Sequence, residues 1–204
     1  MRERSRTLLN LILIPGVFVA FFLGARLFVD LEELPRTNEG TMMVPHVQLA
    51  DMGLESPEGD AFTAEHSAGR WNLVYVAEAD GSCDLSCRNA LWYQMRQQQR
   101  ALRRDASRVR RIIVHTTEPG EELREFLDSR AEGTGELHAD ADALADAFRK
   151  AEDAPETPHG RLYIMSPDGM VFLWYPVHEE REATLEEAQR LHDDLTHILR
   201  GAPG

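Results

Sequence analysis

Two cysteines, Cys83 and Cys87, are the residues whose type and spacing point most directly to chemistry. They follow a run rich in β-branched and aromatic residues, where a buried strand is expected to pass into a helix. At such a junction, cysteines four positions apart are within disulfide reach. A helix N-terminus lowers the pKa of a thiol, which makes the thiolate available as a nucleophile or as a ligand for a soft metal. The pair can therefore switch between dithiol and disulfide.

A permanent structural disulfide is the alternative interpretation of this pair. In the chain-entropy model, a loop this short constrains the unfolded chain only weakly. Stability alone is therefore a weak reason for the bond, and the functional interpretation is preferred.

The segment 8–29 predicts a single-pass membrane anchor. Residues 8–25, LLNLILIPGVFVAFFLGA, are apolar apart from Asn10, and residues 26–29 extend the run to a length that crosses the hydrocarbon core. Arginines precede this segment and acidic residues follow it. The positive-inside rule then places residues 1–7 in the cytoplasm and the rest of the chain in the periplasm, outside a bacterial inner membrane.

A cleaved signal peptide is the alternative, because Leu23-Gly24-Ala25 is an acceptable cleavage site, although the apolar run is longer than a signal-peptide core. Either way the cysteines reach a compartment where disulfides form and persist.

Residues 30–43 are polar and predict a tether, and residues 44–204 predict one domain of mixed α/β structure. Hydrophobic periodicity and turn signals predict its elements. They are a hairpin over 45–63, a strand at 71–77, a long helix from the cysteines to about 105, a strand at 109–116, a helix from 118, a short strand at 136–138, a helix at 139–151, a hairpin of 161–165 with 170–175, and a helix at 184–200.

This order, with a dithiol after the first central strand, resembles the peroxiredoxin-like branch of the thioredoxin superfamily. Several segments resemble the Sco/SenC family of cytochrome c oxidase assembly proteins. They are the anchor, the lead-in Gly69-x-Trp71-x-Leu73-Val74-x-Val76, the Cys83-x-x-x-Cys87 pair and the late Pro167-Asp168-Gly169 hairpin. The resemblance covers residues 44–200 and implies a thioredoxin-like central mixed sheet flanked by helices.

The family pattern also implies copper, with Cys83, Cys87 and His159 as ligands. Thiolates favour Cu(I), and imidazole also accepts Cu(II). This sequence departs from the pattern after both cysteines, because Asp84 and Arg88 stand where the family carries prolines. The family histidine follows an aspartate, whereas Pro158 precedes His159.

The resemblance implies a membrane-anchored assembly factor that delivers copper to cytochrome c oxidase or reduces its copper-site cysteines. The partner would be an oxidase subunit or another exported thiol protein. A metal-independent thiol–disulfide oxidoreductase and a non-catalytic assembly scaffold are the alternatives. The arginine-rich segment 96–111 is either a docking patch for an acidic partner or lipid, or a solvated helix face.

Composition and motifs exclude other classes. The formal net charge of −13 would repel a nucleic-acid backbone. The sequence contains no Walker loop, G-x-S-x-G or H-E-x-x-H motif, so nucleotide and hydrolase chemistry have no support.

Overall fold

The computed structural model describes residues 16–17, 38–67 and 69–202. The predicted anchor at 8–29 lies outside the described residues except for Gly16 and Val17. Within the described ranges, no helix combines the length and the apolar character that crossing a membrane requires.

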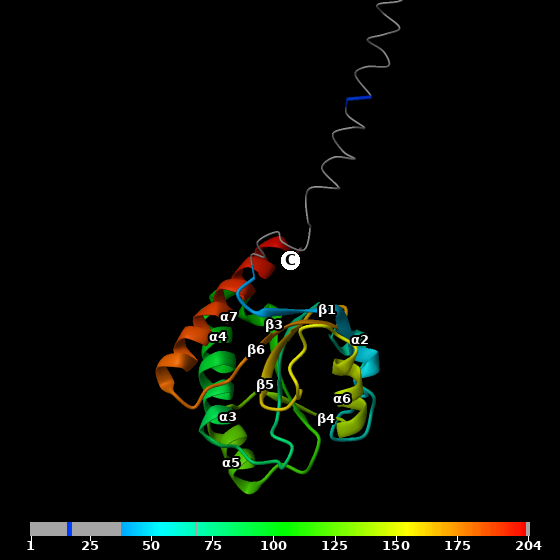
Figure 1. Ribbon diagram of the computed structural model, residues 1–204. Coiled ribbons are helices and arrows are strands. Elements are labelled where there is room, and N and C mark those ends of the chain that lie inside the picture. The colour runs from blue at the N-terminus through cyan, green and yellow to red at the C-terminus, as the bar shows by residue number, and fades with distance from the viewer. Residues whose placement is uncertain (1–15, 18–37, 68, 203–204) are drawn as a thin grey trace, which may run out of the picture. The chain divides into compact units, whose positions relative to one another are not determined.

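The described domain alternates strands and helices in nearly the predicted order (Figure 1). Its elements are β1 Thr41–Gln48, the 3₁₀-helix η1 Leu49–Asp51, α2 Ala64–Ser67, β2 Trp71–Val76, α3 Leu85–Asn89, the π-helix η2 Ala90–Gln97, α4 Gln98–Ala101, the 3₁₀-helix η3 Arg103–Arg108, β3 Val109–His115, α5 Glu121–Ser129, β4 Gly135–His138, α6 Ala141–Arg149, β5 Arg161–Met165, β6 Met170–Tyr175 and α7 Arg181–Gly201.

One mixed sheet organises the domain, with its six strands in the order β1-β6-β5-β2-β3-β4. The central strand β2 is parallel to β3 and antiparallel to β5. Leu73 and Tyr75 pack on one face of the sheet, and Val74 and Val76 pack on the other. Burial of both faces explains why β2 appears in the sequence as a continuous apolar run.

Two helical layers cover the sheet. Figure 1 shows α3, α4, α5 and α7 on one side and α2 and α6 on the other. Buried residues from α3, η2, α5 and α7 form one core cluster with the cysteines, and buried residues of α6 belong to a second cluster on the opposite face. The predicted thioredoxin-like mixed sheet flanked by helices is therefore confirmed.

The domain begins earlier than the predicted residue 44. The compact unit starts at Asn38, and β1 starts at Thr41, inside the stretch predicted as tether. The Asp194 carboxylate accepts a hydrogen bond from the backbone N–H of Gly40 at 2.8 Å. Polar composition suggested a tether, but this long-range contact places Gly40 in the folded domain.

The hairpin predicted over 45–63 forms only in part. The turn is present, because the Phe62 N–H donates to the Leu54 carbonyl at 2.8 Å. The longer strand β1, however, pairs antiparallel with β6 at the sheet edge. β1 therefore pairs with a strand that is far away in the sequence, and not with the neighbouring segment that the turn signal favoured.

The long helix predicted after the cysteines is interrupted. It begins as α3, changes to the π-helix η2 over eight residues and returns to α-helix in α4. The apolar spacing predicted a buried face, and Leu91 and Met95 are indeed buried. The change of hydrogen-bonding pattern was not predicted.

Candidate functional site

Cys83 and Cys87 form a disulfide with their Cα atoms 5.1 Å apart. Cys83 lies in the loop after β2, and Cys87 lies in the first turn of α3. Both side chains pack in the apolar cluster that also contains Tyr75 and Leu123. The junction between strand and helix therefore brings the two cysteines together.

Both cysteines are almost completely buried, with Cys87 at 0% and Cys83 at 2% exposure. Cys83 lines a pocket of about 290 Å³, together with Gly81, Gly120 and Leu123. This pocket places Cys83, and not the fully buried Cys87, on the side of the disulfide from which a reactant would approach.

Asp84 holds the loop between the cysteines in place. It is the N-cap of α3, and its Oδ1 accepts hydrogen bonds from the Cys87 N–H at 2.9 Å and from the Ser86 hydroxyl at 2.7 Å. An aspartate at this position satisfies an N–H group that would otherwise lack a partner at the start of the helix.

Arg88 also stabilises this loop. Its Nε donates to the Cys83 carbonyl at 3.2 Å, and its guanidinium forms a 2.8 Å ion pair with Glu122 of α5. Asp84 and Arg88, the departures from the Sco pattern that follow the cysteines, therefore both make contacts within the disulfide loop. Sequence reasoning noted both residues but missed these roles.

Acidic side chains surround the loop before Cys83. Burial raises the pKa of Glu78, and repulsion from Asp84 and Asp80 raises it further, while Arg161 opposes the shift. Hydrogen bonds from Ser82 lower the pKa of Asp80. Cys83 thus follows a segment of acidic residues.

His159 lies on the loop before β5 and is held by two threonines. Its Nε2 is 2.8 Å from the Thr116 hydroxyl, and its Nδ1 is 3.2 Å from the Thr157 hydroxyl. Partial burial lowers its pKa, so the neutral imidazole is favoured. The structure describes no group of three His, Cys, Asp or Glu side chains that could hold a metal ion. Ligation of copper by Cys83, Cys87 and His159 therefore stays a prediction.

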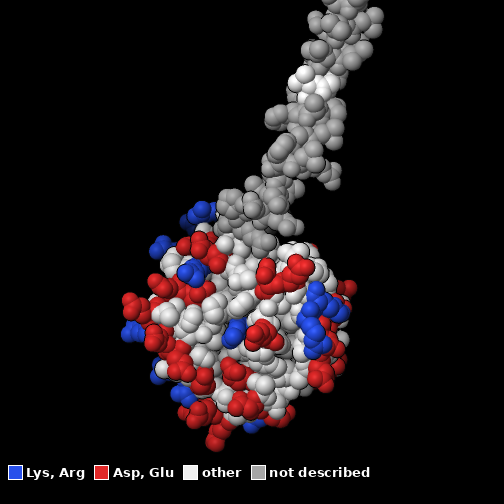
Figure 2. Space-filling model, viewed as in Figure 1, with Lys and Arg blue, Asp and Glu red and all other residues white. Residues whose placement is uncertain are grey.

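Part of the arginine-rich segment 96–111 serves the fold. Arg111 is buried and donates to the Gln99 Oε1 at 2.7 Å and to the Glu132 carbonyl at 2.7 Å. Arg108 donates to the Leu199 carbonyl at 2.9 Å. These arginines connect elements of the fold. Figure 2 shows acidic side chains spread widely over the face in view.

Comparisons with known proteins agree with this architecture. A family model described as "Transmembrane-like, thioredoxin-like, C-terminal domain" matches residues 71–201. No curated protein is similar enough to count as a match.

Solved structures with the same fold include Sco proteins. Yeast Sco1 is 15% identical with a TM-score of 0.53, and the alignment covers 83% of this chain and 99% of that chain. Yeast Sco1 with copper bound is 15% identical with a TM-score of 0.52, over 83% of this chain and 97% of that one. Apo Sco1 from Thermus thermophilus is 14% identical with a TM-score of 0.52, over 79% and 97%. The predicted resemblance to Sco proteins is thus confirmed at the level of the fold.

Proposed function

We propose that this chain, which belongs to the transmembrane-like, thioredoxin-like C-terminal domain family, is a Sco-like thiol–disulfide exchange protein. The observation that carries the proposal is the Cys83–Cys87 disulfide, in which Cys83 lines a pocket while Cys87 is fully buried. Cys83 is therefore the sulfur that an incoming thiol would meet first.

The exchange is a thiolate displacement. A partner thiolate attacks the Cys83 Sγ, a new sulfur–sulfur bond forms, and Cys87 leaves as a thiolate. In the opposite direction, the Cys83 thiolate of the dithiol form attacks a partner disulfide. Cys87 then attacks the mixed disulfide and releases the partner as a dithiol, with two electrons transferred. A second exported dithiol protein would reduce the pair again.

The specific partner that we propose is a copper-binding subunit of cytochrome c oxidase, reached from an inner-membrane anchor at residues 8–29. Reduction of its copper-site cysteines needs only Cys83 and Cys87. Copper delivery also needs His159, whose two ring nitrogens already lie within hydrogen-bond distance of threonine hydroxyls, and it needs the disulfide to be reduced first. The contacts of His159 therefore favour the reductive role over delivery.

Trapping of the mixed disulfide tests the exchange. In the detergent-solubilised full chain, Cys87→Ser leaves Cys83 without its resolving partner. This variant is expected to form a stable mixed disulfide with an oxidised two-cysteine peptide of the oxidase copper site. The matched variant Cys83→Ser is expected to form little, because Cys87 is buried. Intact mass spectrometry measures both, and equal trapping or none would contradict the proposal.

A metal-independent oxidoreductase that acts on other exported proteins shares this chemistry. Titration of the reduced full chain with Cu(I) separates the two roles. Tight binding that weakens in His159→Ala would support copper delivery. Exchange without such binding would support the metal-independent role. If oxidase assembly is unaffected when both cysteines are replaced, the protein would act only as a non-catalytic assembly scaffold.

A further inference from the structure

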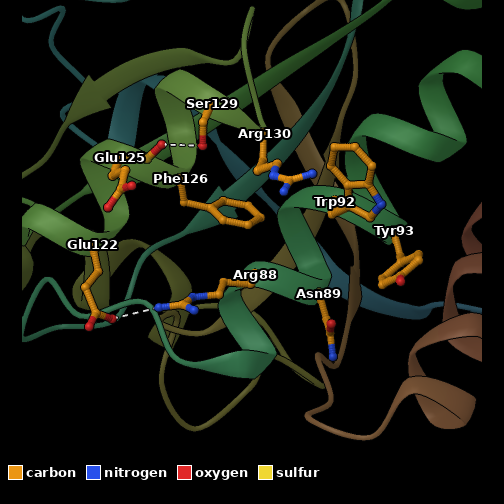
Figure 3. Close-up of a pocket in the computed structure, with 9 residues that line it drawn as sticks. All are labelled: Arg88, Asn89, Trp92, Tyr93, Glu122, Glu125, Phe126, Ser129 and Arg130. Atoms are coloured by element: carbon orange, nitrogen blue, oxygen red, sulfur yellow. Dashed lines mark hydrogen bonds and ion pairs between the residues drawn. The ribbon is translucent and has the colours of Figure 1, made fainter.

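A second pocket lies beside the disulfide loop, between α3 with η2 and α5 (Figure 3). Its volume is about 540 Å³. Trp92 and Tyr93 of η2 and Phe126 of α5 are its aromatic residues, and all three are partly buried. Figure 3 shows the Phe126 ring and the Arg130 guanidinium pointing toward Trp92. Aromatic rings of this kind provide a large contact area for an apolar or aromatic side chain.

This aromatic pocket, defined by Trp92, Tyr93 and Phe126, adjoins the pocket at Cys83, because Glu122 lines both pockets. Arg88 lines the aromatic pocket, pairs with Glu122 and donates to the Cys83 carbonyl. The two adjoining pockets together define a path that runs from Cys83 past Glu122 to the aromatic pocket.

The two ends of the path differ in charge. Asp80, Glu121 and Glu122 line the Cys83 end. At the aromatic end, the Arg130 guanidinium has no ion-pair partner in the described part of the chain, and the Arg96 guanidinium lies 4.9 Å from the centroid of the Trp92 ring. The acidic end suits a basic group, and the aromatic end suits a ring that packs against Trp92 and Arg130.

We infer that this path binds an extended segment of the exchange partner, with a basic residue beside the reacting cysteine and an aromatic residue in the aromatic pocket. The inference rests on the proposed function and adds the recognition element of the substrate. A polypeptide is the occupant because a cysteine-bearing chain can fill both adjoining pockets while its thiolate attacks Cys83. The bond changes are those of the exchange step, so the pocket contributes binding only.

The test uses the full chain in detergent and three synthetic peptides. The reference peptide carries Lys-Cys and a nearby Trp, and single changes give Trp→Ala and Lys→Glu versions. Intact mass spectrometry follows reaction of each thiol with the oxidised protein, and glutathione serves as a small thiol without either feature. We expect each peptide change to slow exchange about tenfold, the factor that follows from losing one favourable contact. Equal rates for the three peptides would overturn the inference.

Phe126→Ala examines the pocket itself. It is expected to slow the reference peptide about tenfold and to leave the glutathione rate unchanged. Phe62→Ala is the matched control, because Phe62 is also partly buried but packs with the core cluster on the opposite face of the sheet. An equal slowing of glutathione in Phe126→Ala would mean that the residue acts on the disulfide, which would overturn a docking role.

A measurement of peptide binding without exchange tests the docking inference separately from the proposed function. The fluorescence anisotropy of a labelled, S-methylated reference peptide measures docking when no thiol can react. Binding that weakens in Phe126→Ala and in the Trp→Ala peptide would support docking. If glutathione and the peptides nevertheless failed to exchange, that failure would contradict the proposed function alone. Exchange with glutathione together with no peptide binding would overturn the docking inference alone.

Discussion

The Asp84 carboxylate accepts a hydrogen bond from the Cys87 N–H at 2.9 Å. The residue that caps α3 thus lies between the two cysteines and is bonded to the backbone of the second one. Stability of the helix start and placement of the buried sulfur therefore depend on the same side chain.

Replacement of this cap by Asp84→Ala is expected to lower the free energy of unfolding by about 1 kcal/mol, the usual loss for an N-cap. Asp84→Asn keeps an acceptor oxygen and is expected to stay close to the parent. Denaturant unfolding of the oxidised proteins provides the measurement. Equal losses for Ala and Asn would show that the charge of Asp84, and not its capping bond, supports the loop.

Gly81 cannot accept a side chain at the base of the disulfide loop. Its φ is +73°, and an added Cβ would lie 2.4 Å from the Glu118 carbonyl oxygen. Gly53 is the matched control, because its φ is +59° and an added Cβ meets nothing within 4 Å.

Gly53→Ala is expected to cost about 1 kcal/mol for the left-handed backbone conformation alone. Gly81→Ala should cost clearly more, because the loop must also move away from Glu118, and should change the rate of exchange at Cys83. Unfolding and glutathione exchange, measured side by side, check both effects. Similar values for the two variants would contradict the close approach.

Reduction of the disulfide is expected to leave the domain folded. Only residues 84–86 separate the cysteines, so the chain-entropy model assigns the bond about 2 kcal/mol. Denaturant unfolding with and without a phosphine reductant measures the difference, and the double variant Cys83→Ala/Cys87→Ala should match the reduced protein. Collapse of the fold on reduction would indicate a structural bond and would count against exchange.

The lowered pKa of His159 predicts a loss of stability in mild acid. Burial lowers its pKa below the ordinary value of 6.5. Between that value and the lower folded pKa, the unfolded state binds more protons than the folded state, so stability falls as pH falls through this window. His159→Gln should reduce the slope. NMR titration of the imidazole checks the direction, and a pKa above 6.5 would contradict it.

The fold was largely predictable because most of its elements carry local signals. The β-branched run of β2 and the Pro167-Asp168-Gly169 turn before β6 both appear where the sequence places them. The pairing of β1 with β6 and the π-helical pattern of η2 were not predicted. The local sequence has no hydrophobic period that identifies a strand partner far away in the chain. It also has none that marks a change from one helical hydrogen-bonding pattern to another.

The local contacts of the site were predictable, and its long-range contacts were not. The spacing of the cysteines predicts their pairing. The Asp84 cap also has a local signal, because aspartate is a preferred N-cap residue and accepts a hydrogen bond from the N–H three positions later. The Arg88–Glu122 pair joins residues 34 positions apart, and the His159–Thr116 contact joins residues 43 positions apart. Contacts of that range depend on how α5 and the loop before β5 pack, which no sequence pattern specifies.

The π-helix makes the length of η2 as consequential as its composition. Each N–H of a π-helix bonds to the carbonyl five residues earlier, whereas each N–H of an α-helix bonds to the carbonyl four residues earlier. Deleting one residue within Ala90–Gln97 should therefore let η2 close as α-helix while α3 and α4 on either side keep their orientation. Homologous chains that are one residue shorter here should accordingly be continuously α-helical after the disulfide and keep the same arrangement around it.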